Sequence, residues 1–322
     1  AGMIIKHVVS FSGGKDSAAT LGIALQRCRR EHIIAVFADT GNEHRLTLDH
    51  LDTTERALGI EIIRLKADFA AQMARKRLFI ARDQRRGRGP DGRRKRWTNK
   101  AKRRALAALW PTGIPFLDLC MLKGRFPSRR AQFCTAELKR NIIVDFQLGL
   151  IDAGYGVISW QGVRRDESTN RRHVKRAERI GPALWTFRPL VDATALQVIA
   201  YCDTHDIPVN PLYRQGMRRV GCMPCINVGK EELRQISQRF PEYLRERAEW
   251  ERLVSACSKR GHSTFFHKVS HDRRGHPDRI FRRENIAAAV KWSQTARGGR
   301  QYDLLALMDD PAGCSSAWGL CE

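Results

Sequence analysis

The residues with the most evident chemistry lie near the N-terminus, in the loop Ser12-Gly13-Gly14-Lys15-Asp16-Ser17. Two adjacent glycines permit a tight turn and bring backbone N–H groups close to an anion. The helix expected to begin in this loop points its positive end at the same anion. Lys15 adds a charge, the two serines add hydroxyl groups, and Asp16 is a candidate ligand for phosphate-bound magnesium. The loop therefore predicts a nucleotide-phosphate site.

The spacing of this loop separates it from better-known phosphate loops. It matches neither Gly-x-x-x-x-Gly-Lys-Ser/Thr nor Gly-x-Gly-x-x-Gly. A Gly-Gly pair alone is often only a structural turn, and that alternative has to be weighed. Here the whole hexapeptide follows a strand-like run and precedes a helix-like one, which favours nucleotide binding.

The nine cysteines include a pair at metal-ligand spacing, Cys222-x-x-Cys225. Alone, such a pair is compatible with zinc, redox or iron–sulfur chemistry. Cys134, Cys314 and Cys321 are further candidate ligands. Without a matching pair of histidines, the set indicates either an all-thiolate zinc site or a cubane cluster. The remaining cysteines are expected in the core: Cys28, Cys120, Cys202 and Cys257.

The elements that must position the loop follow a β-α-β-α-β order. Strands are expected over residues 4–11, 33–38 and 60–65, with helices over 16–30 and 45–58 between them. The sheet is expected to resume at 156–160. This order predicts an α/β fold with a parallel sheet covered by helices. Ligands of such sheets bind beyond the carboxyl ends of the strands, where the glycine loop and Asp39-Thr40-Gly41 both fall.

We expect a nucleotide-binding domain over residues 1–190 and a helical C-terminal region over 191–322. Helices are expected there over 193–205, 231–240 and 241–259, followed by a Cys-rich tail. Residues 82–104 interrupt the first domain with a basic insertion, predicted as a flexible loop whose Trp97 is available to stack on a base. The alternative is an insertion with no specific role.

The chain carries a formal net charge of +24 and has a pI near 10.4. Such an excess repels itself and usually serves a polyanionic partner, so nucleic-acid binding is predicted. The alternative is a generic solubilising surface. No apolar run reaches the roughly 18 residues that a membrane helix needs, and no signal peptide is evident, so a cytoplasmic protein without a membrane partner is expected.

Several segments together resemble the PP-loop ATP pyrophosphatases and, within them, the phosphoadenosine phosphosulfate (PAPS) reductase family. Phage-encoded members and the ATP pyrophosphatases of DNA phosphorothioation are similar in the same places. The resemblance implies a HUP-like fold of the adenine nucleotide alpha hydrolase type. Besides the loop, the matching segments are Asp39–His44, Phe133–Lys139, Gly162–Ser168, Asn210–Tyr213 and Val220–Cys225.

The resemblance also assigns roles. An intact loop, Ser12 to Ser17, implies cleavage of ATP between the α and β phosphates, whereas the reductases carry an altered loop and bind a preformed adenylyl sulfate. Lys15 and Asp16 then become catalytic candidates, with ATP and Mg²⁺ as cofactors. Asp39 falls in the family's nucleotide pocket. A second phosphate-side contact is implied for Gly162, Arg164 and Glu167, the alternative for Arg164 being a surface salt bridge.

For the cysteines, the resemblance favours a [4Fe–4S] cluster, with zinc as the alternative. The expected ligands are Cys134, Cys222, Cys225 and Cys314, with Cys321 competing for the fourth place. The reductases have paired cysteines where Cys134 stands alone. The C-terminal Gly-Leu-Cys-Glu is similar to the reductases' mobile cysteine motif, which makes Cys321 a candidate sulfur carrier; a plain tail thiol is the alternative.

The function expected from these features is AMP-forming, ATP-dependent sulfur transfer to nucleic acid through an adenylated intermediate. A sulfur donor protein is a possible second partner. One alternative is a PAPS or adenylyl-sulfate reductase that releases sulfite. The other is a non-catalytic ATP- and nucleic-acid-binding subunit of a modification or defence complex. The sequence identifies neither the acceptor, nor the sulfur donor, nor the oligomeric state.

Overall fold

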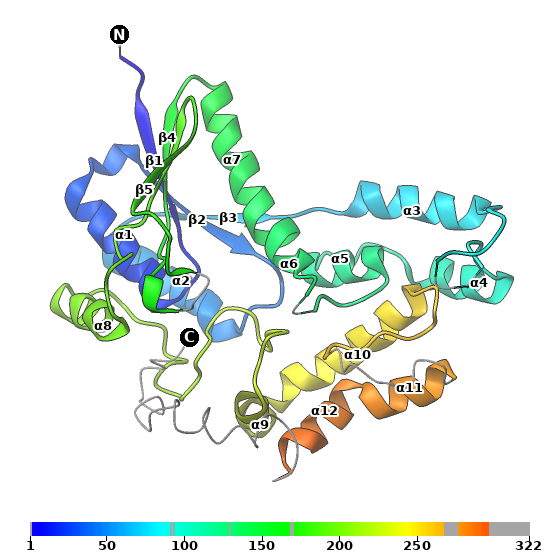
Figure 1. Cartoon of the computed structure of the whole chain (residues 1–322). Helices are drawn as coiled ribbons and strands as arrows, with labels where there is room; N and C mark the ends of the chain where they lie inside the picture. Colours follow the sequence, from blue (N-terminus) through cyan, green and yellow to red (C-terminus); the bar gives the residue numbers. More distant parts are fainter. Residues whose placement is uncertain are drawn as a thin grey trace. The chain divides into compact units, whose positions relative to one another are not determined.

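The computed structural model describes residues 2–90, 92, 94–128, 130–167, 171–266 and 276–295. These residues group into two compact units. The sheet unit comprises residues up to Lys66 together with Glu137–Met223. The helical unit comprises Ala67–Ala136 together with residues from Pro224 onward. This grouping differs from the expected division at residue 190, because the chain leaves the sheet after its third strand and returns to it later (Figure 1).

The sheet unit is built on six described strands in the order β3-β2-β1-β4-β6-β5. Five of them run parallel, and only β5 pairs antiparallel, with β6. The predicted α/β fold with a parallel sheet is therefore confirmed. The β5–β6 hairpin at one edge was not predicted. The strands are β1 (Ile5–Ser10), β2 (Ile33–Asp39), β3 (Ile62–Lys66), β4 (Gly156–Trp160), β5 (Ala177–Gly181) and β6 (Leu184–Phe187).

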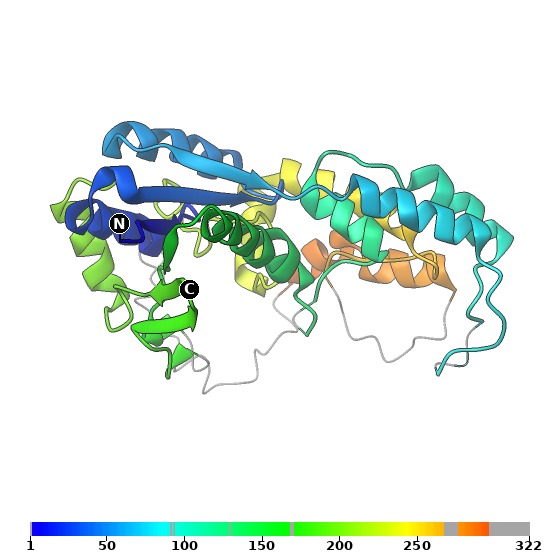
Figure 2. The ribbon, with the colours of Figure 1, turned by 90° about the horizontal axis from the view of Figure 1, so that it is seen from above.

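Alternation along β1 divides the core of the sheet unit into two layers. Val9 faces a cluster that includes side chains of α1 and α8, whereas Val8 faces the side chains of α7. Both valines are fully buried, as expected for a central strand covered by helices on each face. The helices of this unit are α1 (Lys15–Arg27), α2 (Arg45–Leu58), α7 (Asn141–Asp152) and α8 (Ala195–Thr204), with short 3₁₀ turns at Arg30–His32 and Arg165–Glu167 (Figures 1 and 2).

Predicted and observed boundaries agree closely in this unit. The helix expected over 45–58 is α2, closed by Gly59 in a left-handed conformation (φ 62°). The helix expected over 16–30 begins at Lys15 and ends earlier, at Arg27, because Cys28 already adopts an extended conformation.

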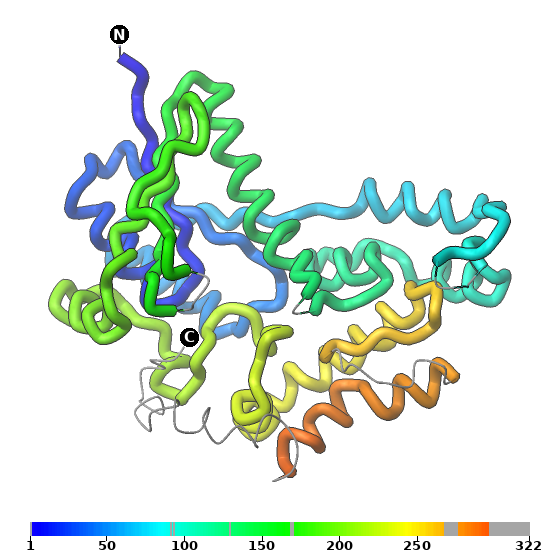
Figure 3. Tube along the Cα trace, viewed as in Figure 1, coloured from blue at the N-terminus to red at the C-terminus, as the bar shows by residue number. Residues whose placement is uncertain are grey.

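The helical unit is organised around aromatic side chains. Phe116, Phe126 and Phe265 lie within 6.5 Å of one another by ring centroids, and Trp250 lies 5.9 Å from Phe116. Such rings supply most of the apolar burial in a small core. The course of the chain through this unit can be followed in Figure 3. Its helices are α3 (Ala70–Arg82), α4 (Asn99–Ala108), α5 (Pro115–Lys123), α6 (Phe133–Thr135), α9 (Lys230–Arg239), α10 (Pro241–Cys257), α11 (Pro277–Glu284) and α12 (Ile286–Ser293). A π-helical turn over Ala136–Arg140 follows α6 in the chain, and all but its first residue belong to the sheet unit.

The basic segment over 82–104 is more ordered than a flexible loop. Its last residues already belong to α4, and Trp97 is buried, so the expectation that Trp97 stacks on a base is wrong. The carboxylate of Asp83 explains this order, because it accepts hydrogen bonds from the backbone of Trp97 at 2.8 Å and from Arg85 Nε at 2.8 Å. Among the described helices, none is long and apolar enough to cross a membrane.

Candidate nucleotide site

The candidate site lies in the sheet unit, where three parallel strands end side by side. The loop that starts at Ser12 follows β1, Asp39 ends β2, and the segment containing Gly162 follows β4. These strands are neighbours in the sheet, so their carboxyl ends bring the three segments to one edge. The strand order predicted this for the glycine loop and Asp39, and the family resemblance implied it for Gly162. The segment from Asn210 to Cys222 contacts the same edge.

The phosphate loop turns sharply between β1 and α1. Gly13 has φ 80°, and a Cβ added there would lie 2.7 Å from Thr47 Cγ2, so both conformation and space require glycine. Ser17 closes the loop: its hydroxyl donates to Gly14 O at 2.8 Å and accepts from Ser12 N at 3.1 Å. The backbone N–H groups of Asp16 and Ser17, in the first turn of α1, have no acceptor within the helix and can bind an anion, whereas the N–H of Lys15 donates to Tyr213.

Gly162 brings the β4 segment against the start of α1. A Cβ at Gly162 would lie 2.8 Å from both C and O of Asp16, and 2.9 Å from Ser17 N. All three are backbone atoms of the first helical turn, so no side chain can move aside to make room. The glycine found by resemblance therefore has a physical reason: close approach of two backbones at the phosphate loop.

Arg164 is buried, with 2% of its surface exposed. Its Nε donates to Asp16 Oδ1 at 2.6 Å, and its other nitrogens face Asp166 and Glu167. The alternative of a surface salt bridge is therefore wrong for Arg164. The ion pair fixes the phosphate loop to the segment after β4 and places a permanent cation beside it.

Asp16 is surrounded by cations. Its Oδ1 accepts from Arg164, while its Oδ2 lies 3.6 Å from Lys15 Nζ. A magnesium ion at Asp16 would have to compete with both. Lys15 is fully buried, and its ammonium also lies 5.3 Å from the centre of the Tyr213 ring.

The segment Asn210–Tyr213 holds the loop from the other side. Asn210 Nδ2 donates to Gly13 O at 3.2 Å and to Thr47 Oγ1 at 3.2 Å. The hydroxyl of Tyr213 accepts the N–H of Lys15 at 3.3 Å. We did not predict these two residues as site residues from the sequence. The signal was their place in one of the segments that resemble the family.

The end of β2 forms a separate polar cluster. Asp39 accepts from Gly41 N at 2.8 Å, which turns the chain toward Glu43. The buried Glu43 accepts from Thr40 Oγ1 at 2.6 Å and from Thr40 N at 3.1 Å. Burial raises the pKa of Glu43, while nearby Lys139 and the hydrogen bond from Thr40 act in the opposite direction. Asp39 is thus a residue that shapes the turn at the nucleotide edge.

Only some of the candidate metal ligands lie in the described part of the chain. Cys222 Sγ lies 3.9 Å from Glu43 Oε1 and 3.7 Å from Thr40 Oγ1 in the sheet unit. In the helical unit, Cys225 Sγ accepts the N–H of Asn227 at 3.5 Å, a bond that suits a thiolate ligand. Cys134 is half-buried, also in the helical unit. Cys314 and Cys321 lie outside the described residues, and within those residues no three His, Cys, Asp or Glu side chains form a metal site.

The other cysteines behave as expected of core residues. Cys120, Cys202 and Cys257 are buried, and Cys28 is half-buried. Burial raises the pKa of both Cys202 and Cys257 to about 12, so these thiols stay protonated at neutral pH.

Comparison with known families agrees with this geometry. The model of the phosphoadenosine phosphosulfate reductase domain family matches residues 6–228, which include all three strand ends and the Cys222–Cys225 pair. This span is more than half of the chain, so the protein belongs to that family.

Individual relatives differ in how much of the chain they match. An uncharacterized 37.8 kDa protein from the gpa 5′ region of Escherichia phage 186 is 44% identical, over 98% of this chain and 96% of that protein. The adenosine 5′-phosphosulfate reductase of Deinococcus radiodurans is 39% identical over only 20% of this chain and 26% of that enzyme. The phosphate complex of the phosphoadenylyl-sulfate reductase of Candida auris aligns with 68% of this chain and 82% of its own, at 14% identity and a TM-score of 0.40.

Proposed function

We propose that this protein is an AMP-forming, PP-loop ATP pyrophosphatase that adenylates a nucleic-acid acceptor and then exchanges the adenylate for sulfur. The observation that carries the proposal is the convergence on α1 of an intact Ser12–Ser17 loop, the glycine at 162 and the buried Arg164. Family membership supports an enzyme of this superfamily but leaves its activity open.

The activation step follows from the residues around the loop. The backbone N–H groups at the start of α1 bind the phosphates of ATP, and Mg²⁺ shares their charge. An acceptor oxygen attacks the α-phosphorus, the bond from that phosphorus to the bridging oxygen breaks, and pyrophosphate leaves. Arg164 and Lys15, both buried, place positive charge next to the loop in which the leaving group develops its negative charge.

The second step replaces AMP by sulfur. A sulfur nucleophile attacks the adenylated atom, and AMP leaves with the former acceptor oxygen. We propose that this nucleophile is the outer sulfur of a persulfide on Cys321, delivered by a donor protein. A second thiol, from the donor protein or a thiol reductant, then attacks the Cys321 sulfur, so that the S–S bond breaks, the transferred sulfur stays on the acceptor and a disulfide forms at Cys321. A [4Fe–4S] cluster on Cys134, Cys222, Cys225 and a tail cysteine would supply sulfur or redox chemistry when bound. The acceptance of an N–H by the Cys225 sulfur is compatible with such a ligand, and equally with zinc.

The test of the activation step uses the full chain, ATP labelled at the α-phosphate, nucleic acid and a persulfide donor. We expect AMP and pyrophosphate in equal amounts, and sulfur in the nucleic acid. Lys15→Met should abolish AMP formation, whereas Lys66→Met, which removes an exposed lysine at the end of β3, should not. Thermal unfolding of both variants separates lost chemistry from lost folding. Cleavage of ATP to ADP would show that the proposal is wrong.

The nature of the metal centre is tested separately. The anaerobically purified protein should be brown, with iron and acid-labile sulfide near four each per chain if the [4Fe–4S] proposal holds. A colourless protein that contains zinc would contradict the [4Fe–4S] proposal and weaken the proposal of a sulfur-transfer step.

The second candidate function is a PAPS or adenylyl-sulfate reductase. The specific observation in its favour is the family match over residues 6–228. It predicts sulfite release from PAPS or adenylyl sulfate in the presence of a thiol reductant. Sulfite without AMP formation from ATP would favour this candidate over our proposal. Nucleic-acid binding with neither product would favour a non-catalytic subunit.

A further inference from the structure

The positive charge of this protein is distributed very unevenly between its two units. Residues 67–136 and 224–295 contain 34 Lys and Arg against 13 Asp and Glu, a formal net charge of +21. Residues 1–66 and 137–223, which hold the nucleotide site, contain 22 against 17, a net charge of +5. A polyanion is therefore attracted mainly to the helical unit rather than to the phosphate loop.

Many cations of the helical unit have structural roles. Arg77 donates to Leu109 O at 3.0 Å, and Arg104 donates to the carbonyls of Ala256 and Ser258 at 3.1 and 2.6 Å. Lys102 donates to Ala81 O and Asp83 O, both at 3.0 Å. These groups hold the helices together and are not available to a partner.

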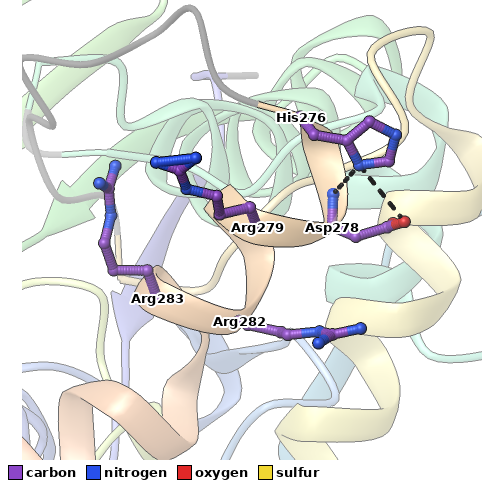
Figure 4. Close-up of a pocket in the computed structure, with 5 residues that line it drawn as sticks. All are labelled: His276, Asp278, Arg279, Arg282 and Arg283. Carbon is purple, nitrogen blue, oxygen red and sulfur yellow. Dashed lines mark hydrogen bonds and ion pairs between the residues drawn. The ribbon is translucent and has the colours of Figure 1, made fainter.

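Helix α11 carries arginines that are exposed to solvent, unlike the lysine and arginine side chains that bond to backbone carbonyls elsewhere in the unit. Arg279, Arg282 and Arg283 follow at positions i, i+3 and i+4, and all three are exposed. With His276 and Asp278 they line a pocket of about 540 Å³. Figure 4 shows the guanidinium groups of Arg279 and Arg283 extending toward the same side of the helix.

The side chains of Arg279 and Arg282 form no hydrogen bond or ion pair within the described part of the chain, whereas the Arg283 side chain lies 3.3 Å from Glu284. The one acidic side chain of the pocket, Asp278, is next to His276, with Oδ2 at 3.5 Å from Nδ1. Two exposed arginine side chains with no acceptor among the described residues are suited to bind phosphate oxygens.

The opposite face of α11 fixes its position. Ile280 and Glu284, also four residues apart, are buried. The next helix is tied to α10, because the carboxylate of Glu251 accepts Ile286 N at 2.9 Å and Phe265 N at 2.7 Å. The arginine face is thus held by the core of the unit, and its ordering cost on binding is confined to side chains.

We propose that the arginine face of α11, defined by Arg279, Arg282 and Arg283, binds the phosphodiester backbone of a nucleic acid. The pocket is open and its cations are exposed, so a single small anion would gain little from it. A polymer of phosphates gains from repeated contacts and from the +21 charge of the whole unit. This inference rests on the nucleic-acid partner of the proposed function and assigns it a surface outside the phosphate loop.

The test measures binding of the full chain to labelled duplex DNA and to RNA by fluorescence anisotropy, without ATP, from 50 to 300 mM salt. Two phosphate contacts contribute a slope of about 1.8 in log affinity against log salt. We therefore expect Arg279→Ala/Arg282→Ala to weaken binding roughly 10- to 60-fold at 0.1 M salt and to reduce the slope by about 2. Arg279→Lys/Arg282→Lys should retain most of the slope.

The matched control is Arg27→Ala/Arg29→Ala, which removes two exposed arginines from the sheet unit. It should change the affinity by less than about twofold if charge position matters. Equal losses in the two alanine pairs, or an unchanged salt slope, would overturn the proposal. So would equal binding of polyglutamate. The binding assay contains no ATP and is therefore independent of the activation assay. Binding in the first assay together with no AMP formation in the second would refute the proposed function and leave this inference standing.

Discussion

Gly162→Ala is the sharpest test of the nucleotide site, because its effect can be worked out from three distances. The new Cβ would lie 2.8 Å from C and O of Asp16 and 2.9 Å from Ser17 N. Ordinary contacts of a Cβ begin at 3.4 Å, so the segment after β4 and the first turn of α1 must separate by about 0.6 Å. Every clashing atom is backbone, so the strain cannot be relieved by a rotamer change.

Overpacking of this kind costs about 1–3 kcal/mol of folding free energy. The displaced atoms include the amide of Ser17, one of the groups proposed to bind phosphate. We therefore expect ATP affinity to fall at least tenfold, which corresponds to about 1.4 kcal/mol. Urea unfolding measures the first effect, and isothermal titration calorimetry with ATP and Mg²⁺ measures the second.

Gly149→Ala provides the control, since it adds the same methyl group in α7 with nothing within 4 Å of it. Removing a glycine from a helix interior should stabilise the protein by about 0.5–1 kcal/mol and leave ATP affinity unchanged. If the two variants unfold at the same urea concentration and bind ATP equally, the close approach of Gly162 to the phosphate loop is not a determinant of the site.

Three further predictions concern charge and pH. Arg164→Met should lower the free energy of unfolding in urea by roughly 3 kcal/mol, because it leaves Asp16 buried with Lys15 as its only cation. The control Arg165→Met changes an exposed residue paired with Asp192 and should lower it by less than about 1 kcal/mol. Equal losses would contradict the importance of the buried pair. Burial lowers the pKa of His50 from 6.5 to about 4, so between these pH values the unfolded chain binds a proton that the folded chain does not. The stability of the sheet unit should therefore fall by up to about 3 kcal/mol as the pH drops from 6.5 to 4. In His50→Leu, unfolding curves should show a weaker pH dependence in this range. Burial raises the pKa of Glu251 from 4.5 to about 7, although the hydrogen bonds from Ile286 and Phe265 act in the opposite direction. The folded helical unit therefore keeps this proton, and its stability should fall as the pH rises from 4.5 to 7. Glu251→Gln should remove this decrease, and a decrease that persists in the variant would assign it to another group.

The sheet unit was predictable because its local signals agree with its fold. The apolar run before Ser12, the Gly-Gly turn and the periodic helix after it point to the same β1-loop-α1 arrangement that the structure has. Helix α2 was expected over 45–58 and has these bounds, and the structure shows the left-handed Gly59 at its end. The edge to which these elements bring the loop and Asp39 follows from the parallel order alone.

In the helical unit, the helices expected over 231–240 and 241–259 are observed as α9 and α10. The basic segment of that unit and several contacts of the candidate site were not predictable in this way. A run of arginines and glycines over 82–104 indicates a solvated loop, whereas bonds such as those from Trp97 N to Asp83 and from Lys259 Nζ to Lys95 O show that it is tethered. The bonds of Asn210 and Tyr213 to the loop span 197 and 198 residues, which no periodicity records. Burial of Arg164 likewise depends on its partner Asp16, 148 residues earlier.

These separations have a consequence for the order of events during synthesis. Strand β1 and the Gly-Gly turn leave the ribosome early, but β4, which pairs with β1, begins only at Gly156. The inserted helices α3 to α5 are made in between, but their core also requires Trp250 and Phe265, which are synthesised later still. A nascent chain shorter than about 213 residues has the phosphate turn without Tyr213 to hold it. Protection of ribosome-bound chains against proteolysis by added ATP should therefore appear only after Tyr213 has been synthesised.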